Sequence, residues 1–177
     1  IIECEAGVLL ADLIARALPL GWFPAVTPGT KYVSIGGAIA NDVHGKNQVS
    51  AGSFGEHVLG LELLRSDGER IHCSPTETPS WFAATLGGLG LTGMVTRATL
   101  QLRPVAGPWI DAQEQRFGSL ADFYQLSAAN ADEYSVAWVD CLAEGKQRGR
   151  GVFSSGNHSA NAGEAKNANE VRGNVSL

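Results

Sequence analysis

The residues most able to do chemistry are concentrated in one short stretch, residues 34–47, which reads SIGGAIANDVHGKN. Paired glycines such as Gly36 and Gly37 let a ligand approach the backbone closely, and the N–H groups of a first helical turn can donate to phosphate or carbonyl oxygens. Histidine can accept or donate a proton near neutral pH, and lysine supplies a positive charge. With His44 and Lys46 close behind the glycines, the stretch predicts a binding site for a ligand rich in acceptor oxygens.

The spacing within this stretch predicts a short helix over residues 35–43, closed by Gly45. Its apolar residues recur at four-residue steps: Ile35, Ile39 and Val43. The opposite face carries small or polar residues: Gly37, Asn41 and His44. An ordinary amphipathic helix with a solvated outer face is the simpler alternative, and the combination of glycine pair, histidine and lysine favours a ligand site over it.

A second glycine cluster, residues 88–93, satisfies the G-x-G-x-x-G pattern literally. A dinucleotide-binding turn requires a strand before the first glycine and a helix after it. Here a helical pattern over residues 81–86 precedes the cluster and an alternating strand from Met94 follows it. The reversed order favours a tight helix-to-strand turn over direct contact with a ligand.

The remaining elements predict a mixed fold. Residues 9–18 show helical spacing ended by Pro19 and Gly21, and residues 57–64 and 69–73 form a hairpin around the turn at 66–68. After a proline-bracketed boundary at residues 104–108, Ser119 opens a helix near 120–126, and residues 134–142 alternate as a strand. Helices mixed with an antiparallel hairpin, without regular βαβ alternation, indicate the α+β class.

Composition narrows the function. The 177 residues carry a formal charge of −5 and a pI of about 5.3, which disfavours nucleic acid as a partner. No apolar run is long enough to span a bilayer. Three widely spaced cysteines and histidines without metal-ligand spacing give no metal site. The start at Ile1 without Met, and the polar sequence from Ser155 onward, lead us to expect a fragment. Residues 155–177 would form a loose polar tail, a truncated loop or an inserted surface segment.

The motifs resemble those of FAD-linked oxidases of the vanillyl-alcohol oxidase type, with a PCMH-type FAD-binding domain. The similarity lies in the runs PGT at 28–30, GGAI at 36–39, HGKN at 44–47, AGSFG at 51–55, GGLGLTG at 87–93 and YSVAWVD at 134–140. The HGKN form is most similar to the decaprenylphosphoryl-ribose 2'-oxidase subfamily. The resemblance covers roughly residues 1 to 154 and implies FAD as cofactor.

Residue by residue, the resemblance implies a set of FAD-lining positions: Gly29, Thr30, Ser34, Gly36, Gly37, Ala38, Asn41, Val43, His44, Gly45 and Val95. His44 and Lys46 are the expected catalytic residues, and Lys46 and Asn47 the expected substrate contacts. Gln48 stands where members of the family often have a second histidine.

The resemblance also implies the domain layout and the activity. Residues 1–104 would form the second FAD-binding subdomain, an antiparallel sheet flanked by helices, and residues 105–154 the start of a substrate domain. The expected activity is oxidation of a CH–OH group of a sugar or polyprenyl-phosphate sugar by hydride transfer to flavin. A catalytically inactive fragment or binding module with half of the flavin site is the alternative. The expected location is the cytoplasm or the periphery of the bacterial inner membrane.

Overall fold

The computed structural model describes residues 1–160, which form two compact units. The first unit is Ile1–Val105, and the second begins at Ala106. The division falls inside the proline-bracketed segment 104–108.

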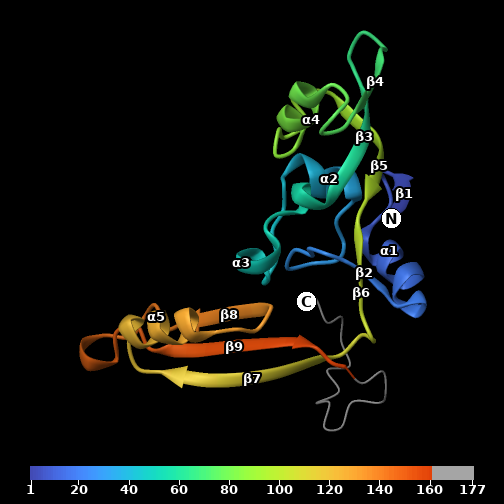
Figure 1. The fold of residues 1–177 in the computed structure, drawn as a ribbon. Helices are drawn as coiled ribbons and strands as arrows, with labels where there is room; N and C mark the ends of the chain where they lie inside the picture. The colour runs from blue at the N-terminus through green and yellow to red at the C-terminus, as the bar shows by residue number, and fades with distance from the viewer. Residues whose placement is uncertain (161–177) are drawn as a thin grey trace. The chain divides into compact units, whose positions relative to one another are not determined.

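The first unit is organised around a four-stranded antiparallel sheet in the order β1-β5-β3-β4 (Figure 1). Its strands are β1 (Ile2–Glu5), β3 (Val58–Leu64), β4 (Arg70–Cys73) and β5 (Met94–Leu100). The predicted hairpin is confirmed, since β3 pairs with β4 and Gly68 adopts a φ of 87° in the connecting turn. A further antiparallel pair joins β2 (Trp22–Pro24) to β6 (Leu102–Pro104).

The first helix is present as predicted. α1 spans Leu10–Ala17 and continues into the 3-10 turn η1 (Leu18–Leu20), which ends at Gly21 with a φ of 79°. Its buried residues are those of the apolar face: Leu10, Leu13 and Ala17. They share one core with α2 and the sheet, in which Leu10, Ile35, Ile39 and Leu63 are fully buried.

The second helix is shorter than predicted. α2 spans Ile35–Ala40, so Val43 and His44 lie beyond its end, where Asn41 is the cap. Asp42 follows with a φ of 42°, a left-handed conformation that stops a helix and that aspartate tolerates better than most residues. The prediction of a helix over residues 35–43 closed by Gly45 is therefore wrong at its C-terminal end. The next elements are α3 (Gln48–Ala51) and the 3-10 turn η2 (Phe54–His57).

The glycine cluster at 88–93 joins α4 (Pro79–Thr85) to β5. This is the predicted helix-turn-strand order, the reverse of a dinucleotide-binding turn. The turn packs against the end of α2, because the N–H groups of Gly87 and Leu89 donate to the carbonyls of Ile39 and Ala40 at 3.0 and 2.8 Å. At Gly93, with a φ of 144°, a Cβ would lie 2.6 Å from the Leu64 carbonyl oxygen, so only glycine fits.

The second unit is a three-stranded antiparallel sheet in the order β7-β9-β8, with one helix. Its elements are β7 (Ile110–Phe117), α5 (Leu120–Ala129), β8 (Tyr134–Val139), the 3-10 turn η3 (Gly145–Gln147) and β9 (Gly151–His158). The predicted cap is confirmed, since the Ser119 hydroxyl accepts from the Asp122 N–H. Residues 155–158 belong to the central strand β9 rather than to a loose tail, because β7 pairs with all four and β8 pairs with Ser155 and Gly156. The rest of the predicted tail, from residue 161, lies outside the described residues.

Within the described part of the chain, no helix has the length and apolar character needed to cross a bilayer. The same residues contain no cluster of three or more His, Cys, Asp or Glu side chains placed to hold a metal ion.

Candidate functional site

A groove of about 760 Å³ lies in the first unit, where several elements end or begin. The first turns of α2, the turn between β3 and β4, the end of α4, the glycine turn and the start of β5 all contribute. Its lining residues are mostly small or apolar: Ala6, Gly7, Ser34, Gly36, Gly37, Ala40, Leu64, Arg65, Ser66, Thr85, Gly90, Gly93, Met94 and Val95. Of the predicted flavin-lining residues, Ser34, Gly36, Gly37 and Val95 are among them. The volume is within the range of about 300–1,000 Å³ that is typical of small-molecule sites.

The first-turn amides of α2 are used within the protein. The N–H of Ile35 donates to the Val8 carbonyl at 2.9 Å, and the N–H of Gly36 donates to the Ala6 carbonyl at 2.8 Å. The N–H of Gly37 donates to the Ser34 hydroxyl at 3.1 Å. The expectation that these amides stand ready for ligand oxygens is therefore wrong, because backbone after β1 and the Ser34 cap satisfy them.

The packing around α2 also favours glycine at positions 36 and 37. A Cβ at Gly36 would lie 3.0 Å from the Ala6 Cβ, and a Cβ at Gly37 would lie 3.0 Å from the Ser34 hydroxyl oxygen. Gly36 thus permits close packing of α2 against the residue after β1, and Gly37 leaves room for the Ser34 cap, while both residues still line the groove. The groove is consistent with a cofactor that makes van der Waals contact with small residues on this wall.

The other predicted flavin-lining residues occupy different surroundings. Gly29 and Thr30 lie on an exposed loop, and Asn41 caps α2 with its side-chain N–H donating to the Gly37 carbonyl at 2.9 Å. Val43 is half-buried against the core, and Ala38 is fully buried within it. The interior position of Ala38 follows from its place on the same side of α2 as Ile35.

His44 and Lys46 are exposed on the segment that follows α2. Because α2 ends at Ala40, the predicted helical face of Gly37, Asn41 and His44 does not form. His44 instead makes an isolated antiparallel bridge with Ser53. Its conformation therefore depends on the segment around Ser53.

Asp42 fixes this segment. Its Oδ1 accepts from the Gly55 N–H at 2.7 Å, and its Oδ2 accepts from the Ser53 hydroxyl at 2.8 Å. Asp42 lies just after Asn41, the cap of α2, and its φ of 42° directs the backbone away from the helix axis. One aspartate thus sets the path of the chain toward His44.

Asn47 lies in the interior rather than at a substrate mouth. Its side chain is 1% exposed, and its Nδ2 donates to the Ala25 carbonyl at 2.8 Å. Gly45 is close to the same loop, since a Cβ there would lie 2.4 Å from the Thr27 carbonyl oxygen. These contacts join the HGKN segment to the loop that leads to the PGT segment.

Arg65 is a groove residue that the sequence did not indicate. Its guanidinium lies 4.2 Å from the centroid of the Trp81 ring, and its Nη1 donates to the Thr92 carbonyl. Its main-chain N–H donates to the Glu69 carbonyl at 2.8 Å in the hairpin turn. Trp81 and Thr92 lie far from Arg65 in the sequence, so no local motif marks the position.

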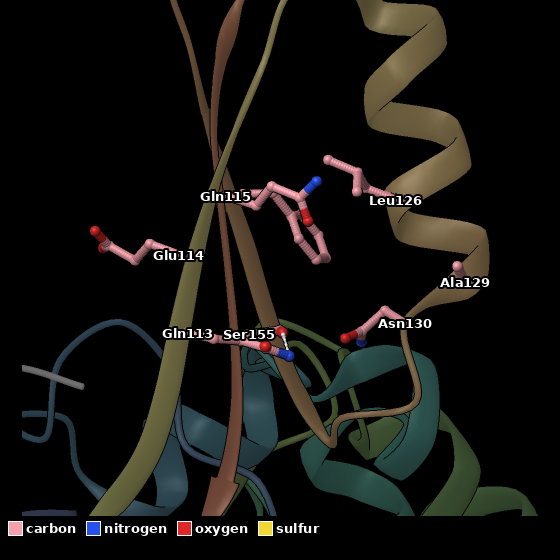
Figure 2. A pocket seen from close by; sticks show the side chains of 8 residues that line it. Gln113, Glu114, Gln115, Leu126, Ala129, Asn130 and Ser155 are labelled. Carbon is pink, nitrogen blue, oxygen red and sulfur yellow. Dashed lines mark hydrogen bonds between the residues drawn. The ribbon is translucent and has the colours of Figure 1, made fainter.

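The second unit has a hollow of its own, of about 390 Å³, between α5 and its sheet (Figure 2). Gln115 and Leu126 point toward one another across it, and Glu114 points away. Gln113 and Ser155 are joined by a hydrogen bond of 3.3 Å at one end. None of the predicted site residues lines this hollow. Phe153, which does line it, packs against the Phe123 ring, and Phe123 in turn packs against Phe117.

Comparison with known proteins identifies the class. Residues 1–74 match the family described as the FAD binding domain. These residues contain α1, α2, the HGKN segment and the β3–β4 hairpin. This part of the chain is therefore similar to the FAD binding domain, and its cofactor is FAD.

Two of the similar proteins are an oxidase and a dehydrogenase by name. The chain is 41% identical over 160 residues to decaprenylphosphoryl-beta-D-ribose oxidase of Mycolicibacterium smegmatis, covering 88% of this chain and 35% of that protein. It is 38% identical over 126 residues to cytokinin dehydrogenase 8 of Oryza sativa subsp. indica, covering 70% of this chain and 24% of that protein. A protein of Streptomyces coelicolor, named as an uncharacterized protein in the mprA 5' region, is 45% identical over 152 residues. The match covers 84% of this chain and 40% of that protein. The chain thus spans well under half the length of these relatives.

Proposed function

We propose that this chain is part of an FAD-dependent oxidoreductase that oxidises a CH–OH group of a sugar or polyprenyl-phosphate sugar. The observation that carries the proposal is the coincidence of the FAD binding domain match with the small-residue groove. The substrate class follows the 41% identity to an oxidase that is named for a decaprenylphosphoryl ribose.

In this proposal a bound flavin would supply the redox chemistry, as the acceptor of the hydride that leaves the carbinol carbon. Ser34, Gly36, Gly37 and Val95 hold the cofactor by contact along the groove. His44 takes the hydroxyl proton or donates to a flavin oxygen, and Lys46 provides positive charge for the reduced cofactor or for a substrate phosphate. Gly29, Thr30, Asn41, Val43 and Gly45 complete the proposed flavin contacts.

The first test is binding. FAD added to the purified chain should give a saturable change in flavin fluorescence. Failure of FAD to bind at any concentration would support the inactive module instead.

The second test is turnover under anaerobic conditions. A polyprenyl-phosphate ribose, free sugars and a cytokinin are each added to the FAD-loaded protein, and the bleaching of the oxidised flavin band is followed. Bleaching by the sugar substrates supports the proposal, whereas bleaching by the cytokinin alone refutes the substrate class.

The third test concerns His44. His44→Gln should slow flavin reduction by about 10²-fold or more, and should weaken FAD binding by a much smaller factor. His72→Gln, at an exposed histidine on β4, serves as the matched control. Equal rates for His44→Gln and the parent chain would remove His44 from the proposed mechanism.

A further inference from the structure

The walls of the groove in the first unit are almost free of charged side chains. Most of its lining residues are glycine, alanine or aliphatic, and Ser34, Ser66 and Thr85 add hydroxyl groups. Among the lining residues, Arg65 alone carries a formal charge. A ligand with negative charge has therefore one cationic partner on these walls.

The guanidinium of Arg65 is held in place before any ligand arrives. One face lies over the Trp81 ring at 4.2 Å, and Nη1 donates to the Thr92 carbonyl. Arginine carries five N–H donors in a planar fork, so most of its donors are left over after this single bond. Because the side chain is already ordered, little conformational entropy remains to be lost when an anion binds.

The main-chain amides at the start of α2 are not free to bind an anion. The amides at the start of α2 all donate to the protein itself, at Val8, Ala6 and Ser34. Within residues 1–160 Arg65 forms no salt bridge, so no carboxylate competes for its charge.

We infer that Arg65 is the anion-binding group of the groove and pairs with a diphosphate, the only part of FAD that is fully ionised at neutral pH. This inference rests on the proposed function in so far as FAD supplies the diphosphate. It also assigns the groove a measurable preference, because ligands with a diphosphate should bind more tightly than the flavin ring alone.

The test compares FAD, ADP and riboflavin as ligands of the full chain by isothermal titration calorimetry. Arg65→Gln should weaken FAD and ADP by about 10- to 100-fold and leave riboflavin unchanged, since a charge-assisted hydrogen bond is lost. Arg65→Lys keeps the charge and should lose less. Arg16→Gln, at an exposed arginine on α1 away from the groove, is the matched control and should change none of the three.

The outcomes separate the two claims. If FAD binds and Arg65→Gln weakens riboflavin as much as FAD, or weakens neither, the assignment of Arg65 fails and the proposed function stands. If ADP binds in an Arg65-dependent manner and FAD does not, the proposed function fails and the diphosphate site stands. If neither FAD nor ADP binds the parent chain, both fail. Melting temperatures of the variants show whether any loss comes from misfolding, and Arg65→Lys then decides the assignment.

Discussion

Replacing Asp42 should be among the most damaging single changes on the path to His44. The carboxylate accepts two hydrogen bonds, from the Gly55 N–H at 2.7 Å and the Ser53 hydroxyl at 2.8 Å. Hydrogen bonds to charged groups contribute about 1.5–3 kcal/mol each, and since this pair is part-buried we take the lower end, about 3 kcal/mol together. The left-handed φ of 42° adds a cost of about 1 kcal/mol for a residue such as alanine.

Three variants separate these contributions. Asp42→Ala should lose about 4 kcal/mol, because the hydrogen bonds disappear and the backbone is strained. Asp42→Gly tolerates the φ and should lose about 3 kcal/mol. Asp42→Asn keeps an acceptor oxygen and tolerates the φ, so a loss of about 1 kcal/mol is expected. Glu5→Ala, at an exposed acid on β1, is the control and should stay within about 0.5 kcal/mol.

Urea unfolding measures the free-energy differences, and amide hydrogen exchange at Gly55 reports the local bond. Exchange at the Gly55 amide should accelerate in Asp42→Ala and Asp42→Gly, and much less in Asp42→Asn. Equal stability of Asp42→Ala and Asp42→Gly would refute the strain contribution. A Gly55 amide that exchanges at the parent rate in all three variants would refute the claim that the Asp42 carboxylate holds this amide.

Two further changes test other contacts. Gly45→Ala should destabilise the first unit by about 1–3 kcal/mol, because a Cβ would lie 2.4 Å from the Thr27 carbonyl oxygen. Gly29→Ala, where a Cβ meets nothing within 4 Å, should change the melting temperature little, and equal effects of the two would contradict the packing argument. In the second unit, hydrogen bonds led by that from Ser155 hold the pKa of Asp132 below its ordinary value. The resulting stabilisation is present at neutral pH and is lost as pH falls through the lowered folded-state pKa, so Ser155→Ala should raise that pKa and start acid unfolding at higher pH. A carboxyl NMR titration of Asp132 that is unchanged in Ser155→Ala would exclude this cause.

Much of the fold follows from local patterns that need no tertiary information. The apolar spacing from Leu9 to Leu18 and the Gly21 stop predict α1, and the turn around Gly68 predicts the β3–β4 hairpin. The order of helix, glycine turn and strand around residues 88–93 argues against a dinucleotide-binding turn from sequence alone. These features depend on residues within a few positions of one another, where chain stereochemistry decides the outcome.

The errors fall where partners distant in sequence decide. Helical spacing extends to Val43, but Asp42 binds Gly55 and Ser53 and turns the chain out of the helix at Ala40. The polar sequence after residue 154 suggests a loose tail, but residues 155–158 pair with β7, and Ser155 and Gly156 pair with β8 as well. Short strands such as β1 and β2 are likewise set by pairing with β5 and β6.

The candidate site divides in the same way. The sequence by itself identified the residues 34–47 as the chemistry-bearing stretch and, through its resemblance, the FAD-linked class. Only the tertiary structure decided that the α2 amides are satisfied by Ala6, Val8 and Ser34 and that Asn47 is buried beneath the surface. It also brought Arg65, Trp81 and Thr92 together at the groove. Residue type and spacing reveal which groups are available, whereas burial and hydrogen-bond competition are properties of the packed chain and determine which groups remain free for a ligand.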